Sequence, residues 1–211
     1  AGTFWIDNIS VFPTASIPIT LTIKPEIRHQ QMVGFGGALT WFRERVLTSP
    51  HSAAIKQLLF EDLGLDVIRF KSWYYPSDYP ANKSASDPTS KELFDGAKAA
   101  NPAVKVLLSS WSPPVSLKSN GSLKDGGTLA SDANGYRYGD FAQYWVDALD
   151  NLGWTPDYLS FQNEPGYVAP WESCIFRPTQ TSVNAGYAEA ADAIHNAIKD
   201  RPNAPVMIGA E

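Results

Sequence analysis

The pattern of hydrophobic and polar positions divides the chain near residue 31. Before that point, apolar and polar residues alternate over Thr3–Val11 and again over Ile17–Ile23. Alternation of this kind predicts β-strands with antiparallel character, and Pro13 and Pro18 interrupt them. Helical periodicity is absent from this part of the sequence, so we expect only strands and turns there.

From Met32 onward, short apolar runs alternate with segments of helical period. A strand followed repeatedly by a helix predicts βαβ units and a parallel sheet, hence an α/β fold. The predicted strands lie within 32–39, 65–70, 104–109, 158–162 and 206–208, and the predicted helices within 52–63, 91–100, 138–152 and 185–199.

Two parallel-sheet architectures fit this alternation, an open doubly wound sheet and a closed barrel. The run Gly34-Phe35-Gly36-Gly37 lacks the full G-x-G-x-x-G fingerprint, and no acidic residue ends the second strand. A dinucleotide-binding fold is therefore disfavoured. The loops after the strands are long and hold most of the Trp and Tyr residues, as expected for the functional face of a β/α barrel.

Composition narrows the function classes. The chain has 211 residues, 44% hydrophobic and 18% charged, which is typical of a globular protein but short for a complete barrel of roughly 250 residues. The net charge of -5 and the lack of a basic block argue against a nucleic-acid-binding protein. No apolar run is long enough to predict a membrane-spanning helix. His29, His51 and His195 are scattered, so we expect no metal and no cofactor.

Three motifs follow predicted strands. Asn163-Glu164-Pro165 places a carboxylic acid at the end of the fourth strand, where barrel side chains enter the cleft. Trp111-Ser112-Pro113-Pro114 holds a Trp in a stiff loop, suited to stacking on a sugar, and Gly34–Ala38 allows close backbone approach. Taken singly, each also fits a plain structural role: a solvated turn glutamate, a core Trp, or a loop.

Jointly, the motifs resemble glycoside hydrolase family 30 from about residue 19 to the end of the chain. The resemblance also includes Lys118-Ser119-Asn120-Gly121-Ser122-Leu123 and Gln162 before Asn163. It implies a (β/α)8 TIM barrel with a side β-structure and a retaining mechanism with two glutamates. It implies that Glu164 is the acid/base, that Asn163 binds the sugar 2-hydroxyl, that Trp111 is a subsite aromatic, and that Arg69 lies under the nucleophile.

The resemblance also implies a domain division. Residues 1–25 are expected to add strands to the side β-domain, and residues 26–211 to form the first five β/α units of the barrel. The family nucleophile lies at the end of the seventh strand, so we do not assign Glu211, at the end of the fifth, to that role. The remainder of the barrel is expected either as a second chain after a proteolytic nick or as a part of the protein outside this sequence.

The remaining predictions concern the cleft and the protein's location. Trp41, Trp73, Tyr167 and Trp171 follow strand ends, and we expect about half of them to contact sugar. Cys174 is either a buried thiol or the partner of a cysteine elsewhere. The sequence starts without Met, which is typical of a processed N-terminus. Three N-glycosylation sequons, at Asn8, Asn82 and Asn120, favour a secreted, extracellular glycoprotein.

Within the family, the sequence favours a polysaccharide substrate, first xylan or glucuronoxylan and second β-1,6-glucan. Other family substrates, β-1,6-galactan and glucosylceramide, stay open. A hypothesis of a different class is a non-catalytic carbohydrate-binding protein on a barrel scaffold, which would share the Trp residues but would not need Asn163 and Glu164.

Overall fold

The computed structural model describes residues 22, 24, 27, 32–85 and 87–209. The chain divides into two units, residues 1–33 and 34–211, and the second carries the fold described below. The predicted strands at 3–11 and 17–23, and with them the expected side β-domain of residues 1–25, lie outside the described residues apart from Thr22 and Lys24.

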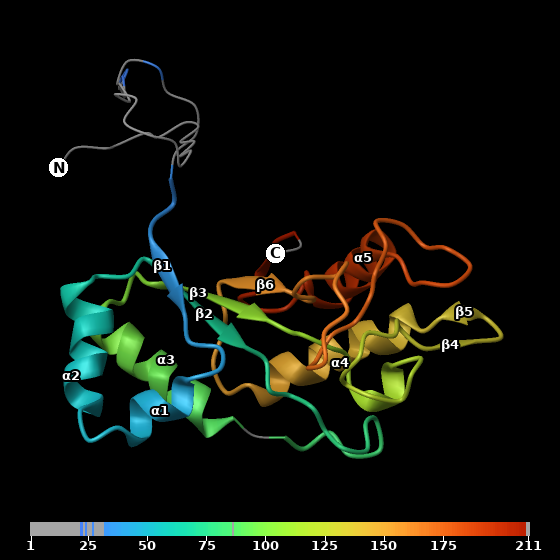
Figure 1. Ribbon diagram of the computed structural model, residues 1–211, viewed down its shortest axis with the longest axis horizontal. Helices are drawn as coiled ribbons and strands as arrows, with labels where there is room; N and C mark the ends of the chain where they lie inside the picture. The colour runs from blue at the N-terminus through green and yellow to red at the C-terminus, as the bar shows by residue number, and fades with distance from the viewer. Residues whose placement is uncertain (1–21, 23, 25–26, 28–31, 86, 210–211) are drawn as a thin grey trace, which may run out of the picture. The chain divides into compact units, whose positions relative to one another are not determined.

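A five-stranded parallel sheet forms the centre of the second unit (Figure 1). Each strand is hydrogen-bonded to the next one along the chain in the order β1-β2-β3-β6-β7. This order has no reversal, unlike that of the doubly wound dinucleotide-binding fold. The strands are β1 (Gly36–Ala38), β2 (Val67–Lys71), β3 (Lys105–Ser109), β6 (Tyr158–Ser160) and β7 (Val206–Met207).

The α/β class and the parallel sheet predicted from the sequence are confirmed. Within the described part of the chain, the sheet has five strands, with β1 and β7 at its edges. These five strands do not by themselves form the closed eight-stranded barrel that the resemblance implies.

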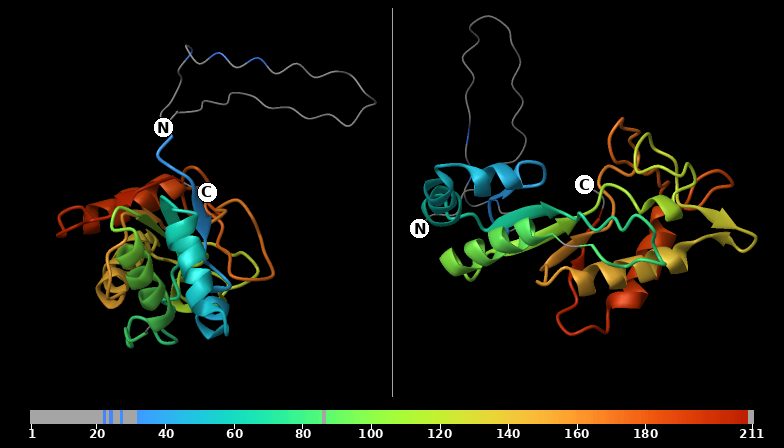
Figure 2. Two further views of the ribbon diagram at one scale, coloured as in Figure 1. Left: turned by 90° about the vertical axis from the view of Figure 1, so that its left-hand side faces the viewer. Right: turned by 90° about the horizontal axis from the view of Figure 1, so that it is seen from below.

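Helices occupy every gap between the strands of this sheet. In the first gap α1 packs against α2, and α3 contacts both, whereas α4 packs along α5 (Figures 1 and 2). The helix predicted over 52–63 is present, but its second half is a π-helix. The helices are α1 (Arg43–Thr48), α2 (Ser52–Gln57), the π-helix η1 (Leu58–Asp62), α3 (Pro88–Ala100), α4 (Tyr138–Asn151) and α5 (Tyr187–Ile198).

Four short elements were not predicted. Helix α1 spans six residues, too few for a periodic pattern to emerge. The long loop after β3 contains a 3-10 helix, η2 (Val115–Leu117), and a hairpin of β4 (Ser131–Asp132) and β5 (Gly135–Tyr136). Each hairpin strand has two residues, and the turn residues between them read as loop in the sequence.

The two faces of β2 have different chemistry. Ile68 and Phe70 are buried in the hydrophobic core, where the Phe70 ring meets Trp154 at 5.7 Å between centroids. Because successive strand side chains point to opposite faces, Arg69 and Lys71 lie on the other face. One face of β2 therefore packs into the core, and the other face carries the positively charged side chains of Arg69 and Lys71.

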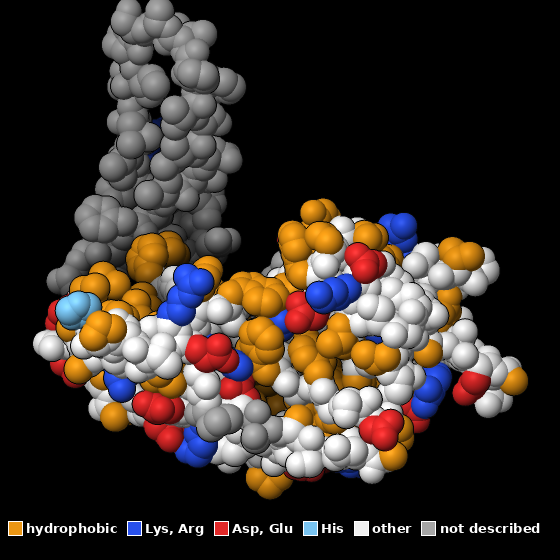
Figure 3. Space-filling model, turned by 60° about the horizontal axis from the view of Figure 1, so that its bottom comes forward, with side chains coloured by type: hydrophobic (Ala, Val, Ile, Leu, Met, Phe, Trp, Pro, Cys, Tyr) orange, Lys and Arg blue, Asp and Glu red, His pale blue; other side chains and the backbone are white. Residues whose placement is uncertain are grey.

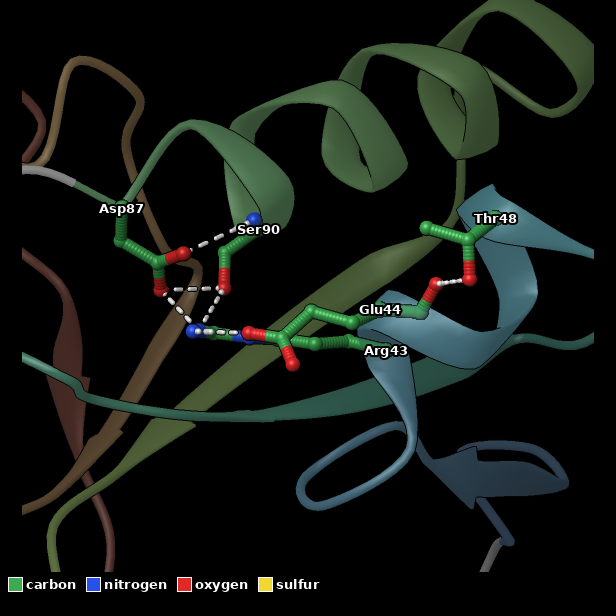
Figure 4. A network of polar contacts seen from close by, with 5 residues as sticks. All are labelled: Arg43, Glu44, Thr48, Asp87 and Ser90. Atoms are coloured by element: carbon green, nitrogen blue, oxygen red, sulfur yellow. Dashed lines mark hydrogen bonds and ion pairs between the residues drawn. The ribbon is translucent and has the colours of Figure 1, made fainter.

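A polar network fixes α1 against the start of α3 (Figure 4). The Asp87 carboxylate caps α3 by accepting a hydrogen bond from the Ser90 backbone N–H at 3.1 Å. The buried Arg43 guanidinium forms an ion pair with Asp87 and donates to the Ser90 Oγ at 3.0 Å. On α1, Glu44 approaches Arg43 at 3.5 Å, and the Thr48 hydroxyl donates to the Glu44 carbonyl.

Candidate active site

A cavity of about 540 Å³ opens where the carboxyl ends of the strands meet. Its side chains come from the segments after β1, β3 and β6 and from β2 itself. On the face of the molecule in Figure 3, hydrophobic side chains gather around neighbouring acidic and basic groups. The cavity is lined by Thr40, Trp41, Arg69, Trp111, Asn163, Glu164 and Trp171.

Glu164 is held in an unusual backbone conformation. Its φ of 45° lies in the left-handed region, which non-glycine residues rarely adopt and which is found at functional sites. The turn is fixed on both sides: the Asn163 N–H donates to the Ser110 carbonyl at 2.7 Å, and the Tyr167 N–H donates to the Glu164 carbonyl at 2.9 Å. The Glu164 carboxylate is exposed and lines the cavity.

Arg69 orients the amide of Asn163. An Arg69 Nη2–H donates to the Asn163 Oδ1 at 2.6 Å, and the Nε–H donates to the Ser109 Oγ on β3 at 3.0 Å. The Asn163 Nδ2 therefore faces Glu164 and donates to its Oε2 at 3.1 Å. The guanidinium also lies over the Trp111 ring, 4.7 Å from the centroid, so Arg69 contacts two of the predicted substrate-binding residues, Asn163 and Trp111.

Gln162 ties the two loops that carry this arrangement. Its buried Nε2 donates to the Trp111 carbonyl at 2.8 Å and to the Asn163 carbonyl at 2.9 Å. The loop after β3 and the loop after β6 are thereby fixed to each other beneath Glu164.

Some of the predicted aromatic residues line the cavity, and others do not. Trp41 and Trp171 line the cavity with 42% and 43% of their surface exposed, enough to stack on a sugar, whereas Trp111 lines it but is buried. Trp73 and Tyr167 do not line the cavity: Trp73 packs edge-on against Trp41 at 5.6 Å, and Tyr167 lies 6.4 Å from Trp171.

Sequence reasoning missed a buried ion pair behind the cavity. The Lys71 Nζ lies 3.1 Å from the Glu172 carboxylate, and the Lys71 side chain is fully buried. Burial lowers the pKa of Lys71 to about 8, although the Glu172 charge acts to raise it. Lys71 ends a buried strand run, which is the signal that could have singled it out, and Glu172 had no motif around it. Thr40 was missed as well.

Cys174, Asn82 and Asn120 do not line the cavity. Burial in the core raises the pKa of the Cys174 thiol to about 12, so the buried-thiol reading fits its surroundings. Asn82 and Asn120 are exposed, whereas Asn8, His29 and Glu211 lie outside the described residues. Among the residues that the structure describes, no cluster of His, Cys, Asp and Glu could hold a metal, and no helix is long and apolar enough to cross a membrane.

Comparisons with known proteins support the resemblance to family 30. The chain is 27% identical over 174 residues to an endo-1,6-β-D-glucanase of Neurospora crassa, covering 70% of this chain and 36% of that protein. The catalytic domain of a GH30 xylanase C from Talaromyces cellulolyticus matches with a TM-score of 0.62 at 19% identity, covering 81% of this chain and 44% of that one. An endo-β-1,6-glucanase structure matches with a TM-score of 0.64 at 20% identity, covering 88% and 46%. No family model matches the sequence.

These similarities confirm the resemblance and show a fold shared with family 30 catalytic domains. The chain spans about a third of the curated relative and under half of the two solved structures.

Proposed function

We propose that this protein, whose fold and motifs resemble those of glycoside hydrolase family 30, cleaves β-linked polysaccharide by double displacement with Glu164 as the acid/base. One observation carries the proposal. Glu164 lies in a sugar-sized, tryptophan-lined cavity beside an amide whose orientation Arg69 fixes. A solvated turn glutamate would need neither the left-handed backbone nor the oriented amide.

The arrangement suits proton transfer to a glycosidic oxygen. An alkoxide leaves poorly, so a carboxylic acid must protonate it as the bond breaks, and the resulting carboxylate then activates water. Asn163 donates to Glu164 in the absence of sugar. When a sugar occupies the cavity, the same amide is placed to bond a hydroxyl beside the cleavage point.

The mechanism needs a second carboxylate as nucleophile, roughly 5–5.5 Å from the first. Among the described residues that line the cavity, Glu164 is the one acid. We therefore infer that the nucleophile comes from a segment outside this chain, and that Arg69 lies beneath it.

The same segment would complete the barrel. Each edge strand, β1 and β7, pairs on one side within the described sheet, and the strands follow one another without reversal. Further β/α units between these edges would give a (β/α)8 barrel. Intact-mass measurement of the active protein tests this: we expect material beyond the 23.1 kDa of this chain, and active material of 23.1 kDa alone would contradict it.

The similar proteins act on two different polysaccharides. The sequence favoured xylan, and one family 30 neighbour is a xylanase, whereas the curated relative and another neighbour are β-1,6-glucanases. The curated relative has the highest identity of the three, so we rank β-1,6-glucan first and xylan second. Hydrolysis rates on defined β-1,6-gluco- and β-1,4-xylo-oligosaccharides decide between them.

We also propose that the protein is secreted and glycosylated. Asn82 is exposed and its Oδ1 accepts from the Ser84 N–H at 2.9 Å. In contrast, the Asn120 Nδ2, the atom that would carry a glycan, donates to the carbonyls of Lys124 and Gly126 at 2.9 and 3.4 Å. We therefore expect peptide mapping of the secreted protein to find glycan at Asn82 ahead of Asn120.

The stereochemistry of hydrolysis tests the proposed reaction. Proton NMR of a digest should show the β-anomer of the product first, because two displacements at one carbon retain configuration. If the α-anomer appears first, the reaction is a single displacement and the retaining mechanism is wrong. If sugar binds without hydrolysis, the protein is a carbohydrate-binding module of the kind considered above.

A further inference from the structure

The ion pair of Lys71 and Glu172 lies behind the cavity and has no part in the chemistry described above. Lys71 ends β2, and Glu172 lies in the loop after β6, which also carries Glu164. Neither residue lines the cavity, but each contacts or adjoins a residue that does.

The Lys71 ammonium is enclosed by tryptophan rings. Its Nζ lies 3.8 Å from the ring centroid of Trp41, 3.9 Å from that of Trp73 and 5.4 Å from that of Trp111. Trp41 also meets Trp73 and Trp111 edge-on, at 5.6 and 5.7 Å. Because the ammonium is desolvated, its cation–π contacts are strong, so the cation restrains the orientation of Trp41.

The other end of the pair restrains the loop after β6. Glu172 follows Trp171 directly, so its bond to Lys71 fixes the backbone that carries this second exposed tryptophan. Lys124 forms an isolated β-bridge with Glu172, and the Ser173 N–H donates to the Leu123 carbonyl at 3.0 Å. One buried ion pair thus joins two aromatic walls of the cavity, the first after β1 and the second after β6.

Global stability does not account for such a pair. Desolvating two charges costs more than their attraction commonly returns, and apolar replacements of similar volume are often neutral or stabilising. A role in orienting Trp41 and Trp171 explains why two charged side chains lie behind the cavity.

We propose that Lys71 and Glu172 are positioning residues that hold Trp41 and Trp171 in the orientation that binds sugar. This inference rests on the proposed function, because it assigns the two tryptophans to the sugar subsites of the same cavity. Neither Lys71 nor Glu172 touches the substrate.

The pair also gives the cavity a pH dependence. Burial depresses the pKa of Lys71 to about 8, Glu172 raises it, and the nearby Arg43 guanidinium, stacked 4.5 Å from the Trp73 centroid, lowers it. Above that pH the ammonium loses its charge, and with it both the ion pair and the cation–π contacts. Aromatic order should therefore fall on the alkaline side while the backbone stays folded.

The test compares wild type with Lys71→Met, Lys71→Arg and Glu172→Gln in the active protein. The control is Lys91→Met, which removes an exposed ion pair with Asp95. Steady-state kinetics should give a KM about tenfold higher for Lys71→Met, with kcat within about threefold of wild type. Glu172→Gln should raise KM by a smaller factor. Lys71→Arg should have a KM between those of wild type and Lys71→Met, and the control should have the wild-type KM. An unchanged KM in a folded Lys71→Met variant would overturn the proposal.

A second readout does not depend on catalysis, and its main observation is made on the wild-type protein. Near-UV circular dichroism of wild type should show an aromatic transition centred near pH 8, with the far-UV signal unchanged. Lys71→Arg should lack this transition, because arginine stays protonated. A flat near-UV signal through this range in wild type overturns the positioning role. If the transition is present but no glycoside is cleaved, the proposed function fails instead.

Discussion

Glu164 and Glu172 lie on one loop beside one cavity, yet their surroundings differ completely. Glu164 is exposed to the cavity, and its carboxylate accepts a hydrogen bond from the neutral amide of Asn163. Glu172 is 16% exposed in its side chain and is paired with the fully buried Lys71. The first carboxylate is available to a substrate, and the second is engaged in an ion pair with Lys71 behind the cavity. Environment, rather than nearness to the cavity, separates the two roles.

The largest expected difference between these residues is in turnover. Glu164→Gln should lower kcat on polysaccharide about 10²–10⁴-fold, because general acid–base catalysis contributes that much. Glu172→Gln should leave kcat within about threefold and act on KM, since it changes only sugar placement. Steady-state kinetics on the same oligosaccharide measures both.

Glu92→Gln is the matched control, because the Glu92 side chain is 62% exposed and pairs only loosely with Lys56 at 3.8 Å. It should behave as wild type. Equal kcat losses from Glu164→Gln and Glu172→Gln would remove the distinction between an acid/base and a positioning carboxylate.

Asn163→Ala should have the next largest effect. It removes the amide that donates to Glu164 and the acceptor for the Arg69 guanidinium. Hydrogen bonds to charged groups contribute about 1.5–3 kcal/mol, so kcat/KM should fall roughly 10- to 100-fold. Thermal unfolding run beside the kinetics separates lost catalysis from lost folding. A kcat/KM unchanged from wild type would show that the amide plays no part.

Arg69→Lys should lower kcat/KM by less than Asn163→Ala does. Lysine keeps the charge but cannot bond Ser109 and Asn163 together through a planar fork. We expect kcat/KM to fall roughly 3- to 10-fold, in line with one lost hydrogen bond. A fall as large as that of Asn163→Ala would indicate that Arg69 acts on more than the amide.

The role of Glu164 and most of the strands and helices could be predicted from the sequence, because each depends on residues that are close together in the chain. Glu164 follows a buried apolar strand and is flanked by Asn163 and Pro165, so one short window indicates a strand end with an acid and an amide. The five strands and the helices between them are likewise local periodic patterns, and the structure confirms them. Helix α1 and the β4–β5 hairpin were too short to give such a pattern.

Glu172 could not be identified in this way, because its role depends on a partner far along the chain. Lys71 and Glu172 meet only once β2 and the loop after β6 are placed side by side, and no spacing rule connects them. Trp73 illustrates the same limit: like Trp41 it follows a strand, but it packs behind Trp41 and not at the cavity.

The smallest expected effect is a pH-dependent gain in stability from Lys71. Its pKa of about 8 lies below the 10.5 of an exposed lysine, so between these values the unfolded chain binds more protons than the folded one. The free energy of unfolding contributed by Lys71 therefore rises with pH in this range. Relative to Lys71→Met, the thermal midpoint of wild type should rise by roughly 2 °C or more between about pH 8 and pH 10. A falling difference would contradict the depressed pKa.

The most direct test of the central claim is the leaving-group dependence of Glu164→Gln. On an aryl glycoside whose phenolate departs without protonation, bond cleavage no longer needs an acid. The account predicts that the first, glycosyl-transfer step of Glu164→Gln stays near the wild-type rate on this substrate, while the polysaccharide rate falls about 10²–10⁴-fold. An equal loss on both substrates would contradict the assignment of Glu164 as the acid/base.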